Sequence, residues 1–113
     1  PIVSLMNYKV ELAPAFIKGA KQLAKKYTSL KTDLAKLFVE LEANPVQGIP
    51  LGHDIYKIRL SIASKGKGKS GGARIITFVR VIQSSVILLT IYNKSEKANI
   101  SDKEIKELLK EYL

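Results

Sequence analysis

Cysteine and tryptophan are absent from this chain of 113 residues, and histidine and methionine each occur once. Without cysteine, neither a disulfide nor a thiolate metal site can form, which fits a reducing compartment. The longest apolar run, Val86 to Tyr92, falls far short of the roughly 20 residues that a membrane-spanning helix requires. The first residues also lack the basic and apolar regions of a secretion signal. We therefore expect a soluble cytoplasmic protein.

Length and composition predict a single domain. With 46% hydrophobic and 26% charged residues, the chain has enough apolar side chains to bury one core. This composition argues against a disordered chain. We expect one domain over residues 1–113. Because Met6-Asn7-Tyr8 has the form of a natural start, residues 1–5 are interpreted as a possible non-native or flexible extension.

Carboxylates are missing from the 41 residues between Asp54 and Glu96, although the same stretch is rich in cations. The remainder of the chain is nearly balanced, with 11 lysines against 10 carboxylates, so the net charge of +9 is a local feature. Such a segment predicts a polyanionic partner, with nucleic acid favoured over an anionic membrane surface. The cations of this segment are Lys57, Arg59, Lys65, Lys67, Lys69, Arg74, Arg80 and Lys94.

Hydrophobic periodicity predicts an α+β fold with helices on one face of a mainly antiparallel, four-stranded sheet. Helical spacing begins at Pro14 and again after Thr28 or Ser29, either of which can cap the second helix, and a capping box at Ser101 and Glu104 predicts a helix at the C-terminal end. Residues 45–53 are expected to be a loop. The predicted order β-α-α-β-β-β-α places strands at 8–12, 55–62, 73–82 and 86–92, the last two as a hairpin.

The segment from Ala63 to Ser70 fits a loosened form of the phosphate-binding loop of nucleotide-binding proteins. That loop needs a helix directly after its serine, whereas Gly71-Gly72 leads into a β-branched strand, and we reject the interpretation. The glycines instead predict a mobile loop. Its lysines either keep a hairpin tip soluble or contact a polyanion.

Period-two alternation places Lys57 and Arg59 on one face of a strand, away from the apolar stripe that packs on the helices. Arg74 joins them if the following hairpin closes. Clustered like charges without an acid partner destabilise a fold, so a functional role is favoured for these three residues. For Arg80 a site role and a solvated strand end are equally favoured.

Other polar residues carry weaker signals. Tyr92 on its own is typical of an aromatic at the rim of the core, with its hydroxyl in water. His53 is either a general base or, as is more common for a lone histidine in a loop, incidental. The lysines of the first helix are interpreted as its solvent face in preference to an RNA contact; they are Lys18, Lys21, Lys25 and Lys26.

Three sequence blocks in series resemble the RelE/ParE toxin superfamily. Within it, they are most similar to the RelE-like HigB branch. The blocks are Tyr56-Lys57-Ile58-Arg59, the stretch from Ser64 through Lys65-Gly66-Lys67-Gly68-Lys69-Ser70-Gly71-Gly72-Ala73-Arg74 to Ile76, and Leu88-Leu89-Thr90-Ile91-Tyr92-Asn93-Lys94.

The resemblance implies the toxin of a bacterial type II toxin–antitoxin module. Such a toxin cleaves mRNA in the ribosomal A site without a metal or other cofactor, by attack of a ribose 2′-hydroxyl on the adjacent phosphate. It also implies a small antitoxin, expected to be a helix-turn-helix DNA-binding protein. Expected catalytic residues are Lys57, Arg59, Arg74 and Tyr92, and expected RNA or ribosome contacts are Lys65, Lys67, Lys69 and Lys94.

The basic residues of the carboxylate-free segment suit this reaction. Cations that contact a pentavalent phosphorane stabilise the negative charge that develops in it. Arg74 is expected to be the main phosphate clamp, since its planar fork can hold two oxygens. The base is either Lys57 as a neutral amine or Tyr92 as an ionised phenol. Relatives that place a histidine or acid near the end of the last strand differ from this chain, which has Asn93 and Lys94 there.

Two alternatives remain from the sequence. The first is a ParE-like, non-enzymatic inhibitor of DNA gyrase on the same fold, which has no need of a phosphate clamp. The second is a plain RNA-binding module, which would display exposed aromatic residues for base stacking.

Overall fold

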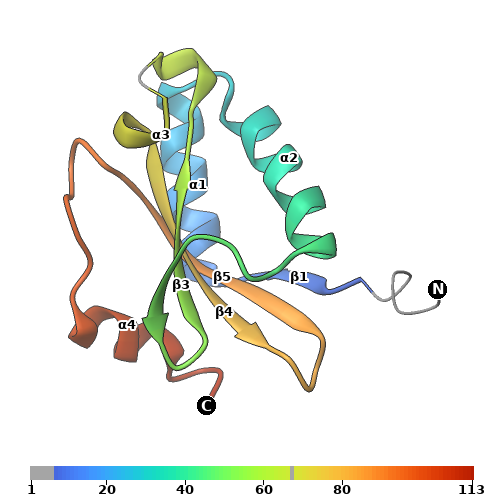
Figure 1. Cartoon of the computed structure of the whole chain (residues 1–113). Coiled ribbons are helices and arrows are strands. Elements are labelled where there is room, and N and C mark those ends of the chain that lie inside the picture. Colours follow the sequence, from blue (N-terminus) through green and yellow to red (C-terminus); the bar gives the residue numbers. More distant parts are fainter. Residues whose placement is uncertain (1–6, 67) are drawn as a thin grey trace.

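A computed structural model describes residues 7–66 and 68–113, so the interpretation of residues 1–5 lies outside the described part. The same holds for Lys67 and for the side chain of Lys69. The elements, shown in Figure 1, are β1 (Lys9–Leu12), α1 (Pro14–Lys26), α2 (Leu30–Ala43), β2 (Ile49–Gly52), β3 (Ile55–Leu60), a 3-10 turn (Ala63–Lys65), α3 (Gly68–Gly71), β4 (Ala73–Arg80), β5 (Ser85–Asn93) and α4 (Asp102–Leu109).

The sheet has five strands in the order β1-β5-β4-β3-β2. β1 runs parallel to β5, and the other neighbours are antiparallel. The expected α+β class and the β4–β5 hairpin are confirmed, but the expected number of strands is wrong. The additional strand, β2, lies in the segment that was expected to be a loop, and all four of its residues are exposed. Pro50 and two flanking glycines hid it, because they are unfavourable in strands except at an edge.

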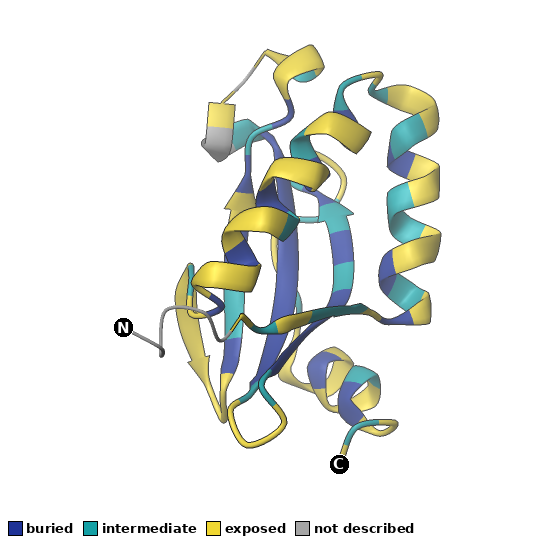
Figure 2. Ribbon diagram, turned by 90° about the vertical axis from the view of Figure 1, so that its right-hand side faces the viewer, coloured by how far each residue is buried: buried dark blue, intermediate teal, exposed yellow. Residues whose placement is uncertain are grey.

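Helices cover both faces of the sheet, which corrects the expectation that they share one. α1 and α2 bury Phe16, Leu30 and Leu41 against one face of the three central strands. α4 places Ile105 and Leu109 on the other face, against residues such as Ile76 and Leu89. Figure 1 shows α4 well apart from α1 and α2, and Figure 2 shows that the central strands are largely buried.

Helix ends follow the local sequence. Pro14 is the first helical residue of α1, where its missing N–H costs no hydrogen bond. The capping box of α4 is present in full, with both Ser101 and Glu104 bonded across the first turn. Ser29 precedes α2, but its side chain does not cap the helix. No helix in the described ranges is long and apolar enough to cross a membrane.

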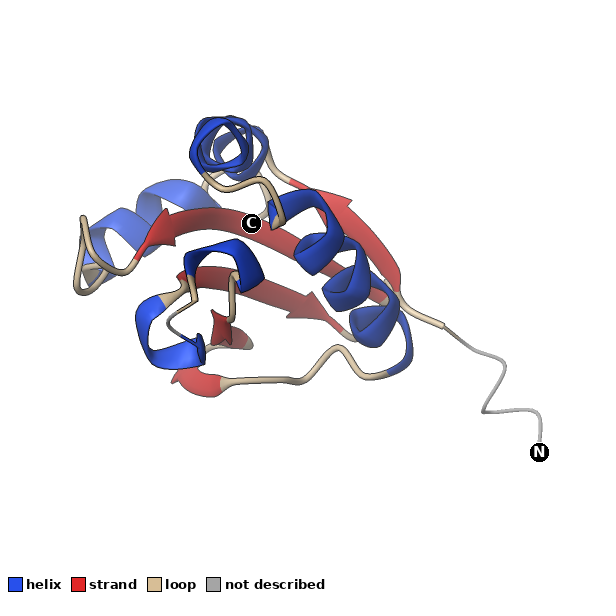
Figure 3. Ribbon diagram, turned by 90° about the horizontal axis from the view of Figure 1, so that it is seen from above, coloured by secondary structure: helices blue, strands red, loops and turns tan. Residues whose placement is uncertain are grey.

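The connection from β3 to β4 holds two short helical segments, the 3-10 turn and α3, which are in front when the molecule is viewed from above in Figure 3. Its first part is tied to α2: the Ser64 N–H donates to Ser29 Oγ at 2.8 Å, and the Ala63 N–H donates to Asp33 Oδ2 at 3.1 Å. Its last residue is tied as well, because the Lys94 N–H donates to the Gly72 carbonyl at 3.1 Å. These bonds anchor both ends of the connection, and the mobility expected for the glycine-rich segment between them stays a prediction.

Candidate functional site

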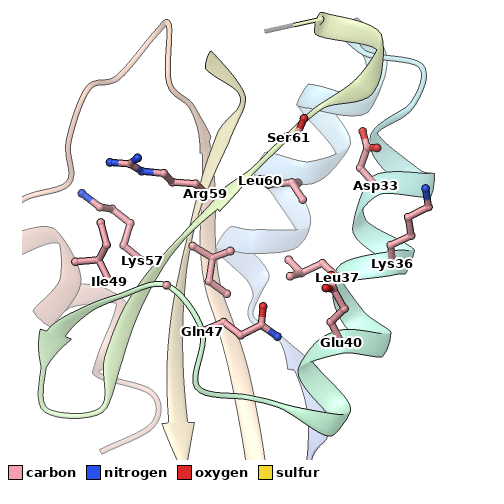
Figure 4. A pocket seen from close by; sticks show the side chains of 12 residues that line it. Asp33, Lys36, Leu37, Glu40, Gln47, Ile49, Lys57, Arg59, Leu60 and Ser61 are labelled. Atoms are coloured by element: carbon pink, nitrogen blue, oxygen red, sulfur yellow. The ribbon is translucent and has the colours of Figure 1, made fainter. Parts of the chain in front are cut away.

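Three polar side chains form one row across the three central strands, near one end of these strands. Arg59 on β3 pairs in register with Arg74 on β4, and Arg74 pairs with Tyr92 on β5. Lys57 lies two residues before Arg59 and therefore on the same face. In Figure 4 the side chains of Lys57 and Arg59 project away from α2. This face of the sheet is also the face on which α4 packs, farther along the strands. Ile55 and Ile76, which point to the same side as the row, belong to the apolar cluster that contains the buried residues of α4.

Arg74 is the buried member of this row, with only 4% of its surface exposed. Its Nη1 donates to the Ala73 carbonyl at 3.2 Å. Burial lowers the pKa of the Arg74 guanidinium, the charge of Arg59 lowers it further, and the Tyr92 phenol acts in the opposite direction. A desolvated guanidinium next to a second cation is a strong anion-binding arrangement, because little water screens it.

Tyr92 lies beside Arg74 with its hydroxyl buried and without a hydrogen-bond partner among the described residues. Burial raises the pKa of the Tyr92 phenol, Arg74 pulls it down, and Glu104 adds to the rise. Burial therefore favours the neutral phenol and disfavours the ionised phenol that was one of the two candidate bases. A neutral phenol in this position has a hydrogen bond to donate.

An ion pair from the C-terminal part of the chain also reaches Tyr92. Lys97 Nζ lies 5.6 Å from the centroid of the Tyr92 ring and pairs with the carboxylate of Glu104. A cavity of about 260 Å³ lies between the end of β5 and α4, with Thr90, Tyr92 and Glu104 among its lining residues. The sequence had assigned Glu104 only to the capping box, since spacing along one helix says nothing about contacts with another element.

Lys65 lies elsewhere. Its Nζ donates to Asn93 Oδ1 at 2.7 Å and to Ser95 Oγ at 2.6 Å, and it lies 5.5 Å from the centroid of the Tyr27 ring. Asn93 follows Tyr92 on β5, so its side chain faces the opposite side of the sheet from the row. The structure thus separates Lys65 from Lys57, Arg59 and Arg74. Lys94 is half-buried at the end of β5.

Gly72 allows the start of β4 to approach the end of β3 closely, next to the row. It precedes Ala73 at the start of β4 and is buried. A Cβ atom on this residue would overlap the carbonyl oxygen of Leu60 and lie 3.2 Å from the Ser61 Cα. Only glycine lets the two chain segments approach this closely beside Arg74.

Arg80, undecided from the sequence, has a structural partner. Its Nη2 donates to Glu11 Oε2 at 2.7 Å and its Nε donates to Ser85 Oγ at 3.0 Å, which ties β1 to the β4–β5 hairpin. His53 and Asp54 form the tight turn between β2 and β3, with positive φ angles of 53° and 65°. His53 is thus distant in register from the Arg59–Arg74–Tyr92 row.

A second cavity, of about 560 Å³, lies between α2 and β3 (Figure 4). Asp33 and Glu40 line it from α2, and Lys57, Arg59 and Leu60 line it from β3. In Figure 4 the side chains of Lys57 and Arg59 project away from α2, so the cavity borders the strand that carries part of the row and does not contain the whole row. Among residues 7–66 and 68–113, no group of three or more histidine, aspartate and glutamate side chains is arranged to hold a metal ion.

Comparison with known families gives one match over most of the chain. The model of the family described as "RelE toxin of RelE / RelB toxin-antitoxin system" matches residues 15–112. The chain belongs to the RelE toxin family.

Solved structures agree with this RelE fold. A double arginine-to-alanine mutant of E. coli toxin RelE in the free state is 20% identical, with a TM-score of 0.62 over 96% of this chain and 100% of that one. The toxin–antitoxin complex RelBE from E. coli matches at 19% identity and a TM-score of 0.58, covering 76% and 95% of the two chains. A RelBE complex from Mycobacterium tuberculosis matches at 15% identity and a TM-score of 0.57, covering 84% and 97%.

The family assignment confirms the RelE/ParE resemblance, while membership of the HigB branch stays a prediction. Of the residues expected in the site of this RelE-family chain, Arg59, Arg74 and Tyr92 share one row, and Lys57 shares their face. The contributions of Glu104 and Lys97 were missed.

Proposed function

We propose that this RelE-family chain is the toxin of a bacterial toxin–antitoxin pair and that it cleaves mRNA on cytoplasmic ribosomes without a metal. The observation that carries the proposal is the row of Arg59, Arg74 and Tyr92 across three neighbouring strands, with Lys57 beside it. A gyrase inhibitor needs no such set of convergent phosphate donors.

In the proposed reaction, the ribose 2′-oxygen attacks the adjacent phosphorus and the 5′-oxygen of the next nucleotide leaves. The products are a 2′,3′-cyclic phosphate and a 5′-hydroxyl. Negative charge grows on the non-bridging oxygens as the phosphorane forms, and Arg74 holds these oxygens with Arg59 beside it. Because Arg74 is fixed and desolvated before substrate arrives, its interaction strengthens as that charge develops.

Tyr92 is proposed to donate its proton to the leaving 5′-oxygen. The buried hydroxyl without a partner among the described residues supports this role, because buried polar groups normally have a partner. Its raised pKa keeps the proton available near neutral pH. Lys57 remains the proposed acceptor of the 2′-hydroxyl proton, and Lys67, Lys69 and Lys94 remain proposed RNA contacts.

The test adds purified protein to translating ribosomes and maps mRNA 5′ ends by primer extension. We expect cuts within the A-site codon, and a loss of about 100-fold or more in single-turnover rate for Arg74→Lys, which keeps the charge but not the two-pronged fork. Lys31→Ala, at an exposed position of α2, is the matched control. Inhibition of gyrase supercoiling without RNA cuts would instead support the ParE-like alternative, and ribosome binding without cuts would support a plain RNA-binding module.

We further propose that a small antitoxin binds and neutralises this chain. The similar structures include toxin–antitoxin complexes of E. coli and M. tuberculosis, which supports a partner of this kind. Co-expression with the product of any short gene found beside the gene for this chain tests it. Growth arrest that this product does not relieve, together with failure of the two proteins to co-purify, would refute the pairing.

A further inference from the structure

A hydrogen-bonded network of four side chains lies behind the Arg59–Arg74–Tyr92 row, on the opposite face of the sheet. We call it the rear network; its members are Tyr27, Lys65, Asn93 and Ser95. They come from the end of α1, the 3-10 turn after β3, the end of β5 and the turn that follows β5. The network therefore joins segments that are far apart in the sequence.

Asn93 is its centre and is 2% exposed. Its Oδ1 accepts from Lys65 Nζ at 2.7 Å, from Ser95 Oγ at 2.8 Å and from the Ser95 N–H at 3.1 Å, while its Nδ2 donates to the Tyr27 hydroxyl at 3.1 Å. The amide oxygen is thus fully used as an acceptor, and one of the two amide hydrogens is used as a donor. A buried amide that is satisfied in this way fixes the position of the backbone that carries it.

The place of that backbone connects the network to the row. Asn93 pairs with Ala73 across β5 and β4, and the next pair along the same two strands is Tyr92 with Arg74. Lys65 in turn follows β3, which carries Arg59. Movement of any of these chain segments would therefore shift at least one member of the row.

We propose that Tyr27, Lys65 and Asn93 are positioning residues, which hold the ends of β3 and β5 so that Arg59, Arg74 and Tyr92 stay in line. This proposal rests on the proposed function. It reassigns Lys65, which the sequence placed among the RNA contacts, to a role inside the fold. Its ammonium group already has two hydrogen-bond acceptors and the face of an aromatic ring.

The phenol of Tyr27 reports on the network independently of any reaction. The hydrogen bond from Asn93 lowers the pKa of Tyr27, and the charges of Lys65 and Lys26 lower it further. Removing Lys65 is therefore expected to raise this pKa, which a titration of the tyrosine ring resonances by NMR measures directly.

The experiment compares Tyr27→Phe, Lys65→Met and the control Lys31→Met in single-turnover cleavage of ribosome-bound mRNA and in the salt dependence of RNA binding. We expect Tyr27→Phe and Lys65→Met each to slow cleavage about tenfold or more, because small displacements of reacting groups are costly. The slope of log affinity against log salt should match that of the wild type in both.

Two results would overturn the proposal. One is cleavage at the wild-type rate by Tyr27→Phe, which loses a single oxygen atom and no charge. The other is a salt slope that falls by about 0.7 in Lys65→Met, as expected when one contact with a phosphate of single-stranded RNA is lost.

Failure of the proposed function is distinguishable from failure of this inference. If the wild-type protein cuts no RNA, the network is judged from the Arg74 Nε–H resonance in Tyr27→Phe. A shifted resonance supports positioning, and an unchanged one refutes it. Thermal unfolding of each variant checks that it is folded during these measurements.

Discussion

Burial and neighbouring charges together set the pKa of single side chains in this molecule, and for Tyr92 the shift makes stability depend on pH. Its folded-state pKa lies above the usual value of about 10 for tyrosine. The folded protein therefore binds a proton that the unfolded chain releases. The stability that this provides is complete below about pH 10 and is lost as the pH rises through the folded-state pKa.

We predict that Tyr92→Phe, which cannot ionise, loses less stability than the wild type between pH 8 and pH 11. Urea unfolding at the two pH values measures the difference. Tyr112, whose pKa burial also raises, is present in both proteins and cancels. Equal losses in both proteins would mean that Tyr92 titrates normally.

The turn between β2 and β3 places two residues other than glycine at positive φ. His53 and Asp54 occupy both central positions of a two-residue hairpin, for which Asn-Gly is the favoured pair. We predict that His53→Asn with Asp54→Gly stabilises the fold by about 0.5 kcal/mol or more, because the backbone strain is relieved. Urea unfolding at neutral pH checks this, and a lower midpoint would indicate that either side chain has a stabilising contact.

Gly72 contributes to stability because it allows two backbone segments to lie close together. We predict that Gly72→Ala costs about 2 kcal/mol or more, since its new methyl group would overlap the Leu60 carbonyl. Gly66→Ala is the control: Gly66 has a φ of 72° but open space where a Cβ would stand, so only backbone strain of about 1 kcal/mol is expected. If the two variants are equally stable, the overlap is relieved by a small movement of β3.

Among the elements, α4 is held by few contacts. It has eight residues, of which Ile105 and Leu109 are buried, and a helix of this length is not stable on its own. Its stability depends on the packing of these two side chains and on the capping box, which is worth about 1 kcal/mol. We predict that Ser101→Ala speeds amide hydrogen exchange in α4 about fivefold, for a loss of about 1 kcal/mol, and leaves exchange in the central strands nearly unchanged. Equal acceleration in β4 and β5 would mean that α4 unfolds only with the whole domain.

Elements with a strong local pattern were predictable, and those that depend on distant partners were not. The alternation from Ile55 to Leu60 correctly separated the cationic side chains from the α2-facing stripe. The amphipathic pattern around Ile105 showed that the last helix is buried, but a pattern along one helix cannot tell which face of a sheet receives it. Lys65 looked like any other lysine of a glycine-rich loop, because its partners Asn93 and Tyr27 are about 30 residues or more away in the sequence.

At the scale of the whole molecule, the charge is concentrated where carboxylates are absent. We predict that affinity for a single-stranded RNA oligonucleotide falls steeply with salt, and that Lys57→Met lowers the slope of log affinity against log salt by about 0.7. Fluorescence anisotropy at a series of salt concentrations measures it. Lys103→Met, at an exposed position of α4, is the matched control, and equal slopes for both variants would remove Lys57 from the binding surface.

The parallel pairing of β1 with β5 sets the order in which the molecule can be completed during its own synthesis. Lys9 pairs with Ser85 and Leu12 with Leu88, so β1 has no partner strand until more than seventy further residues have been translated. α1 also packs largely on β5. A nascent chain whose residues 85–93 are still inside the ribosome therefore has neither a finished sheet nor Tyr92 in place. Under the proposed function, the protein could not act on the ribosome that makes it until that strand has emerged.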